Sequence, residues 1–209
     1  MTPAISGLYA ITPECADTAA LLSQARQVLR GGAQVLQYRS KSDNIALKHG
    51  QAAELLALCR SFHVPLIIND DLRLAALIDA DGVHLGATDP TLKEARINLG
   101  PDKIIGVSCY QDLERAIQVA AQGADYVAFG SFYSSPTKPQ AQPCPAALLT
   151  QAKTKLQIPL VAIGGITTEN TPALIRAGAD AVAVISALFD APDIELTAHL
   201  FTSLFATKH

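Results

Sequence analysis

The sequence lacks the features that mark several large classes of protein. None of its apolar runs approaches the roughly 20 residues of a membrane-spanning helix. Its first residues, Met1-Thr2-Pro3-Ala4, lack the basic segment of a secretion signal. The formal net charge is −3 and the isoelectric point is near 5.9, which disfavours a nucleic-acid partner held by bulk charge. We therefore expect a cytoplasmic protein, compatible with a homo-oligomer, that binds small molecules and neither nucleic acid nor membrane.

Cysteines and nucleophile motifs are also sparse. The four cysteines, Cys15, Cys59, Cys109 and Cys144, are scattered, with no CxxC pair and no spacing typical of a metal site. We interpret them as reduced thiols. No GxGxxG follows the first predicted strand, so the fingerprint of a dinucleotide-binding fold is missing. No obvious Ser/His/Asp or Cys/His set for nucleophilic catalysis is present either.

What the sequence does have is a regular alternation of short apolar runs and amphipathic stretches. With 209 residues, 49% of them hydrophobic, the chain can form one sizeable core, and we expect a single domain over residues 1–209. The alternation is typical of parallel strands joined by helices. The predicted strands are Gly7–Thr12, Gln34–Arg39, Pro65–Asn69, Gly82–Leu85, Ile104–Ser108, Tyr126–Gly130, Leu160–Gly164 and Ala181–Ile185.

Helices are predicted between these strands, and similar phrases recur around them. The clearest helices are Thr18–Leu29, Asn44–Phe62, Leu113–Gln122 and Pro172–Ala177, with N-cap oxygens from Asp43 or Asn44 and from Thr168 or Asn170. The phrases RGGAQVLQYR, AQGADYVAFG and RAGADAVAVI each predict a helix end, a glycine turn and a buried strand. Eight such units predict a (β/α)8 TIM barrel, with an open doubly wound sheet as the alternative.

Polar residues gather at the carboxyl ends of the predicted strands, where both folds carry their functional sites. Gln37, Arg39 and Lys41 share one face if the strand stays extended, and such a group cannot lie in a dry core without partners. The other strand ends carry Asn69, Asp70, Asp71, Asp89, Ser108, the run Ser134-Ser135-Pro136-Thr137-Lys138, Gly164, Gly165 and Ser186. This joint placement at seven strand ends predicts a binding site.

The residue types indicate phosphate and metal chemistry. Asp70 and Asp89, on neighbouring loops, suit Mg²⁺ held mostly through water and phosphate oxygens. Positive charge for a diphosphate would come from Arg39, Lys41 and Lys138, and hydrogen bonds to it from Asn69 and Ser108. Glycines at 164 and 165 would let backbone N–H groups approach a second anion.

Each of these residues also has an ordinary structural interpretation. Asp70-Asp71 and Asp89-Pro90 could each begin a helix. Gly164-Gly165 could be a simple turn, and Lys138 a solvated loop residue. We interpret His84, on a barrel strand, as a satisfied interior histidine in preference to a base.

At this point the chain resembles the thiamine phosphate synthase (thiamine-phosphate pyrophosphorylase) family over nearly its whole length. Order and spacing make the match specific. The residues that carry it are Leu8-Tyr9-Ala10-Ile11-Thr12, Gln37-Tyr38-Arg39-Ser40-Lys41, Ile67-Ile68-Asn69-Asp70-Asp71, Asp81-Gly82-Val83-His84-Leu85-Gly86 with Asp89, Gly106-Val107-Ser108, Gly123-Ala124-Asp125-Tyr126-Val127 with Thr137-Lys138, Ala162-Ile163-Gly164-Gly165-Ile166 and Ala183-Val184-Ile185-Ser186.

The resemblance implies a TIM-barrel enzyme that joins 4-amino-5-hydroxymethyl-2-methylpyrimidine diphosphate to 4-methyl-5-(2-hydroxyethyl)thiazole phosphate, releasing pyrophosphate. By resemblance, Gln37 contacts the pyrimidine, and Asp70 and Asp89 hold Mg²⁺. The residues around the diphosphate would be Arg39, Lys41, Asn69, Ser108 and Lys138, of which Arg39, Ser108 and Lys138 would be catalytic. The thiazole phosphate would be bound by Gly165, Ile185 and Ser186, with Ser135 and Thr137 from the strand-six loop.

The associated mechanism needs no general base. Pyrophosphate leaves an electron-rich aminopyrimidine methylene, and the thiazole nitrogen attacks the resulting cation with a lone pair that carries no proton. The enzyme stabilises the leaving group and keeps water away.

The chain departs from the family pattern at three places. Gly130-Ser131 stands where Gly-Pro is usual, Ser134-Ser135-Pro136-Thr137-Lys138 replaces Pro-Thr-x-Thr-Lys, and Ser40 replaces a frequent Glu. The segment Ser131–Pro145 is our candidate lid. The alternatives are a thiazole tautomerase of the same superfamily, which carries a histidine where this chain has Ser131, and a non-catalytic sensor of phosphate ligands.

Overall fold

The eight predicted strands form a closed barrel. The computed structural model describes residues 5–134 and 144–206. Its strands pair in chain order, and the last returns to pair in parallel with the first. The strands are β1 (Gly7–Ile11), β2 (Val35–Tyr38), β3 (Leu66–Asn69), β4 (Gly82–Leu85), β5 (Ile104–Tyr110), β6 (Tyr126–Gly130), β7 (Leu160–Ile163) and β8 (Ala181–Val184). The predicted (β/α)8 barrel is confirmed, and the open sheet is wrong.

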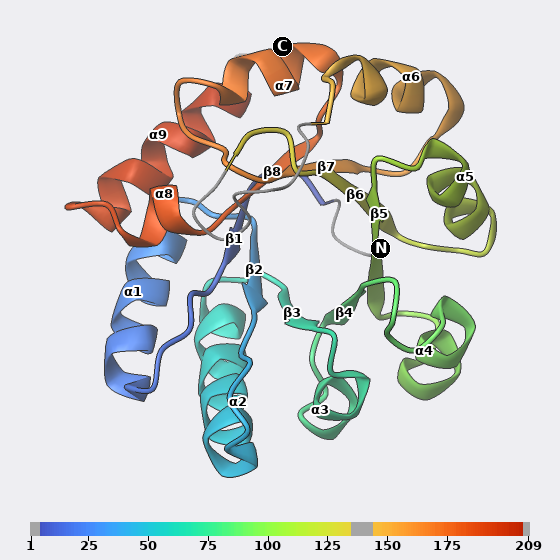
Figure 1. Ribbon diagram of the computed structural model, residues 1–209. Coiled ribbons are helices and arrows are strands. Elements are labelled where there is room, and N and C mark those ends of the chain that lie inside the picture. Colours follow the sequence, from blue (N-terminus) through green and yellow to red (C-terminus); the bar gives the residue numbers. More distant parts are fainter. Residues whose placement is uncertain (1–4, 135–143, 207–209) are drawn as a thin grey trace.

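Helices cover the outside of the barrel (Figure 1). They are α1 (Thr18–Arg30), α2 (Ile45–Ser61), α3 (Leu72–Leu77), α4 (Leu92–Leu99), α5 (Leu113–Ala121), α6 (Ala147–Lys155), α7 (Thr171–Ala177), α8 (Ser186–Phe189) and α9 (Ile194–Ala206). The last helix, α9, packs against α1 and β1. Gly31 permits this contact, because a Cβ at Gly31 would lie 2.4 Å from the Cβ of Ala198. Within the described ranges, no helix has the length and apolar character that crossing a bilayer requires.

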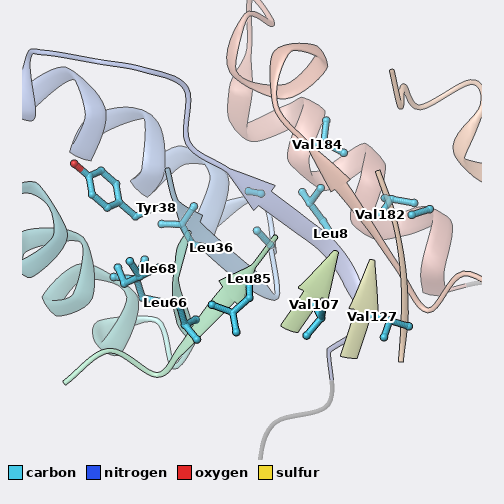
Figure 2. Packing of buried hydrophobic residues seen from close by; sticks show 14 of the residues in the cluster. Leu8, Leu36, Tyr38, Leu66, Ile68, Leu85, Val107, Val127, Val182 and Val184 are labelled. Atoms are coloured by element: carbon cyan, nitrogen blue, oxygen red, sulfur yellow. The ribbon is translucent and has the colours of Figure 1, made fainter. Parts of the chain in front are cut away.

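Side chains alternate along the strands between two hydrophobic layers. The outward layer, which includes Leu36, Tyr38 and Ile68, packs beneath the helices (Figure 2). The inward side chains form a second cluster inside the barrel, to which Tyr9 and Tyr126 belong. A filled interior is typical of this fold, which places its function at the carboxyl ends of the strands.

Three of the repeated units share an aspartate directly before a strand. We call Asp81, Asp125 and Asp180 the clamp aspartates. Each carboxylate accepts a hydrogen bond from a backbone N–H near the start of the preceding strand: Asp81 from Leu66 at 2.8 Å, Asp125 from Ile105 at 2.7 Å and Asp180 from Leu160 at 2.9 Å. The backbone N–H of each aspartate donates to the carbonyl of the same residue. This closed pair of bonds explains why an alanine–aspartate pair recurs before these three strands, since the bonds set the register of neighbouring strands.

Helix starts follow the predicted chemistry in part. Asn44 caps α2, accepting from the backbone N–H of Leu47 at 3.0 Å, as predicted. The ordinary alternative for Asp89-Pro90, a helix start, is not found, because Thr91 is the N-cap of α4 and forms a reciprocal capping box with Glu94. Asn170 stands at the N-cap position of α7 but makes no capping bond there.

Candidate active site

A cavity of about 760 Å³ opens at the carboxyl ends of the strands, a size typical of small-molecule sites. Every predicted site residue that the structure describes lines it: Gln37, Arg39, Lys41, Asn69, Asp70, Asp89, Ser108, Gly165, Ile185 and Ser186. Ser135, Thr137 and Lys138, and most of the predicted lid, lie outside the described residues. Residues on or after six different strands, together with the start of α8, thus meet in one place.

The cationic side of the cavity is held by contacts that the sequence analysis missed. The strand β2 ends at Tyr38, one residue earlier than predicted, and the backbone N–H of Arg39 donates to the Thr12 hydroxyl at 3.0 Å. Glu14 accepts the backbone N–H of Lys41 at 2.8 Å, and its carboxylate lies 3.6 Å from the Arg39 guanidinium. These bonds hold Arg39 and Lys41 at the rim even though the strand does not extend to them.

Asp70 and Asp89 interact with each other at the ends of β3 and β4. Asp70 has a left-handed backbone, with φ of 61°, which is uncommon for a residue other than glycine. Asp71 is the cap of α3, accepting from the N–H of Leu74 at 2.9 Å, so Asp70 is not needed for that role. The carboxylate of Asp89 accepts the N–H of Gly86 at 2.6 Å.

The two carboxylates suit a divalent cation. Desolvation, a hydrogen bond with Asp89 and the negative charge of Asp89 raise the pKa of Asp70 from 3.8 to about 6, while Asn69 and Arg39 oppose the shift. Within residues 5–134 and 144–206, no group of three or more His, Cys, Asp or Glu side chains could enclose a metal ion. A cation held by two carboxylate groups, with water and substrate oxygens as its other ligands, is the usual arrangement for Mg²⁺.

Five side chains from five strands form a continuous chain of hydrogen bonds below the cavity. The Gln37 amide nitrogen donates to the Tyr9 hydroxyl at 2.8 Å, and the Tyr9 and Tyr126 hydroxyls lie 2.7 Å apart. His84 lies 2.9 Å from the Tyr126 hydroxyl through Nδ1 and 2.9 Å from the Ser108 hydroxyl through Nε2. Burial lowers the pKa of His84 to about 4 and raises the pKa values of both tyrosines. His84 is therefore a neutral interior histidine, as predicted, and Ser108 is joined to Gln37.

Steric crowding explains why glycine stands at both positions 164 and 165. Both glycines have positive φ, at 104° and 61°. A Cβ on Gly164 would lie 1.9 Å from the Ser131 hydroxyl oxygen, and one on Gly165 would lie 2.4 Å from the carbonyl oxygen of Ser134. The pair thus lets the loop after β6 pass directly over the end of β7.

Small and aliphatic side chains line the wall of the cavity opposite the charged rim. Ala128, Val161, Ile163 and Ala183 come from β6, β7 and β8. This wall can exclude water from a flat ring while the polar rim holds phosphate groups.

Several residues of the site were not found by sequence reasoning. Tyr9 and Tyr126 point into the barrel from β1 and β6, and the alternation of side chains along a strand could have indicated this. Their contact joins positions 117 residues apart, so no local pattern predicts it. The strand β5 runs past the predicted end at Ser108 to Tyr110, with a register shift against β6, and this places Tyr110 on the cavity wall.

Comparisons with known proteins agree with this geometry. The family described as thiamine monophosphate synthase matches residues 8–188 of the chain. The chain belongs to this family. It is 56% identical to the thiamine-phosphate synthase of Thiobacillus denitrificans, covering 97% of this chain and 96% of that protein. It is 55% identical to the enzyme of the same name from Methylobacillus flagellatus, covering 97% of each.

Solved structures extend the comparison to three dimensions. Thiamine phosphate pyrophosphorylase from Pyrococcus furiosus is 31% identical and superposes with a TM-score of 0.85, covering 96% of this chain and 95% of that one. A 3-hexulose-6-phosphate synthase, 17% identical with a TM-score of 0.71 over 94% of this chain and 98% of that one, shows the fold alone. The resemblance to the thiamine phosphate synthase family is thereby confirmed.

Proposed function

We propose that this protein is a thiamine phosphate synthase that condenses 4-amino-5-hydroxymethyl-2-methylpyrimidine diphosphate with 4-methyl-5-(2-hydroxyethyl)thiazole phosphate, giving thiamine phosphate and pyrophosphate. The observation that carries the proposal is the meeting of Arg39, Lys41, Asp70, Asp89 and Ser108 at one cavity in a chain of this family. These are the groups that a departing diphosphate requires.

Asp70 and Asp89 would hold the Mg²⁺ in this proposal. Their fit rests on the donor set, since hard carboxylate oxygens are the ligands that Mg²⁺ takes, and on the raised pKa of Asp70, which a bound cation would reverse. When bound, the cation supplies positive charge to the leaving diphosphate oxygens.

The side chains of the rim assist departure of pyrophosphate. Arg39 and Lys41 supply charge that does not depend on a proton transfer, and Asn69 and Ser108 donate hydrogen bonds to the oxygens that gain negative charge. By resemblance, Lys138 joins them. Removing one preorganised donor of this kind typically costs about 10²–10³ in rate.

The second substrate completes the reaction without a base. In the proposal, Gly165, Ile185 and Ser186 bind the thiazole phosphate, with Ser135 and Thr137 from the loop after β6. The attacking nitrogen carries no proton, so a neutral His84 is compatible with the mechanism. The apolar wall keeps water from trapping the pyrimidine cation.

The experiment, which we call the coupled assay, measures the joining of the two substrates by the purified protein in the presence of Mg²⁺, with each component omitted in turn. We expect pyrophosphate release that needs all three and thiamine phosphate in equal amount. Isomerisation of the thiazole without coupling would favour the tautomerase. Mg²⁺-independent binding of thiamine phosphate without turnover would favour the sensor. Cytoplasmic location and self-association stay predictions, to be checked by fractionation and light scattering.

A further inference from the structure

The hydrogen-bond chain from Gln37 to Ser108 has a direction that proton counting can determine. It contains three hydroxyl groups, one amide and one imidazole, all on inward faces of the barrel strands. The amide nitrogen of Gln37 carries protons and no lone pair for accepting, so it must donate to Tyr9. Each hydroxyl holds one proton, so each later bond depends on the one before it.

We propose that this chain of hydrogen bonds is polarised, with every donor on the Gln37 side of its acceptor. His84 then carries its proton on Nε2, and the Ser108 hydroxyl points its own proton into the cavity. Tyr9 accepts from Gln37 and donates to Tyr126. Tyr126 donates to Nδ1 of His84, and Nε2–H of His84 donates to Ser108. The inference rests on the proposed function, because it makes Ser108 a donor to the leaving diphosphate, with Tyr9, Tyr126 and His84 as positioning residues.

The reverse direction leaves a buried proton without a partner. If Ser108 donated to His84, the proton of His84 would lie on Nδ1, and Tyr126 would donate to Tyr9. Among the described residues the Tyr9 hydroxyl bonds only to Gln37 and Tyr126, so its proton would then have no acceptor. Tyr9 is 1% exposed, and a buried donor left unsatisfied costs about 1–3 kcal/mol.

The barrel is built to keep these groups in place. Tyr126 lies against Gly106 of β5, where a Cβ would be 1.9 Å from the tyrosine Cζ. The ring of Tyr126 also stacks on His84 with an interplanar angle of 22° and contacts Tyr9 edge-on. His84 and both tyrosines are buried, and their side-chain hydrogen bonds in the described structure join them only to one another, to Gln37 and to Ser108. None of these partners is charged, so each hydroxyl carries one proton and the imidazole carries one, which fixes the number of protons in the hydrogen-bond chain.

The first test reads the tautomer directly and needs no activity. Long-range ¹H–¹⁵N correlation of the ¹⁵N-labelled full chain reports which ring nitrogen of each histidine is protonated, and the His84→Gln spectrum assigns the His84 signals. We expect His84 to be neutral with the proton on Nε2. A proton on Nδ1 would overturn the proposal, whatever the coupled assay shows. Absence of coupling with an Nε2 proton would instead count against the proposed function.

The second test asks whether the chain acts through Ser108. Tyr126→Phe cuts the chain in its middle, and we expect turnover to fall about tenfold. In a Ser108→Ala background the same change should have no further effect, because the two changes then act on one path. Equal losses in both backgrounds would overturn the proposal. Tyr9→Phe breaks the hydrogen-bond chain at a second point, so the same comparison of the two backgrounds can be made with Tyr9→Phe if Tyr126→Phe does not fold.

Tyr38 offers a matched control. It is a buried tyrosine whose hydroxyl donates to Gln51 at 2.8 Å, on the outward face of β2. Tyr38→Phe removes a hydroxyl of the same kind without touching the chain. Its turnover should match that of the unaltered protein, and a tenfold loss there would mean that any lost buried hydroxyl lowers activity, which would overturn the assignment.

Discussion

Aspartates stand at both ends of the barrel, with the same side chain and opposite surroundings. At the amino end, Asp125 and Asp180 accept backbone N–H groups and pair with Arg96 and Lys153, each at 2.7 Å. At the carboxyl end, Asp70 has another carboxylate as its neighbour, and its pKa is raised to about 6. The comparison separates two uses of one residue: charge compensated within the chain stabilises the fold, and charge compensated only in part suits the cation site that we propose.

The largest effect is expected when the pair of carboxylates at the carboxyl end, Asp70 and Asp89, is broken. Asp70→Asn or Asp89→Asn should lower turnover at fixed Mg²⁺ by about 10²–10³ and raise the Mg²⁺ concentration needed for half activity, because one ligand oxygen loses its charge. A Mg²⁺ titration of the coupled reaction measures both quantities. An unchanged titration for either folded variant would contradict the metal assignment.

A smaller effect is expected when one of the clamp aspartates at the amino end is removed. Asp125→Ala should lower the unfolding free energy by about 2–3 kcal/mol, because the Ile105 N–H and the Arg96 guanidinium both lose an acceptor. The melting temperature should fall by roughly 5–10 °C, with kcat nearly unchanged. Asp79→Asn is the matched control: Asp79 pairs with Lys103 and Arg60 but is 72% exposed, so its loss should cost under about 1 kcal/mol. Equal losses for both variants would contradict the clamp.

The smallest expected effect is a pH dependence of folding stability that comes from Asp70. The folded-state pKa of Asp70 (about 6) lies above its ordinary 3.8, so the folded protein binds this proton more tightly than the unfolded chain. Without metal, stability therefore falls as pH rises through this window. Asp70→Asn should remove that loss and melt about 2 °C higher than the parent at pH 7.5.

Adding Mg²⁺ should reverse the order of the two proteins, because the cation stabilises only the form that binds it. Thermal melts with Mg²⁺ and with a chelator give the comparison. A variant that melts lower than the parent in both conditions would show that Asp70 stabilises the fold.

Much of the fold follows from local pattern. The alanine–aspartate pairs mark strand starts because the clamp bonds form between consecutive strand–helix units. Strand ends were less predictable: β2 stops before Arg39, and β5 passes Ser108. Both ends depend on partners from other loops and strands, Thr12 in one case and the shifted register with β6 in the other.

The candidate site divides in the same way. Asp70 directly follows β3, Asp89 lies in the loop after β4, and Ser108 lies near the end of β5, so their position is visible in the sequence. Glu14 reaches the site from the loop after β1, and Tyr9 meets Tyr126 across the closed barrel. Such contacts exist only after the chain has folded, and a single sequence does not reveal them.

The clamps also bear on how the chain acquires its structure. Their partners are 15, 20 and 20 residues apart, so each requires closure of only a short loop and can form early. The pairing of β1 with β8 joins Gly7 to Ala181 and must wait until both ends of the chain are present. We expect the seam beneath α1 and α9 to be the last part of the barrel to gain protection from hydrogen exchange during refolding.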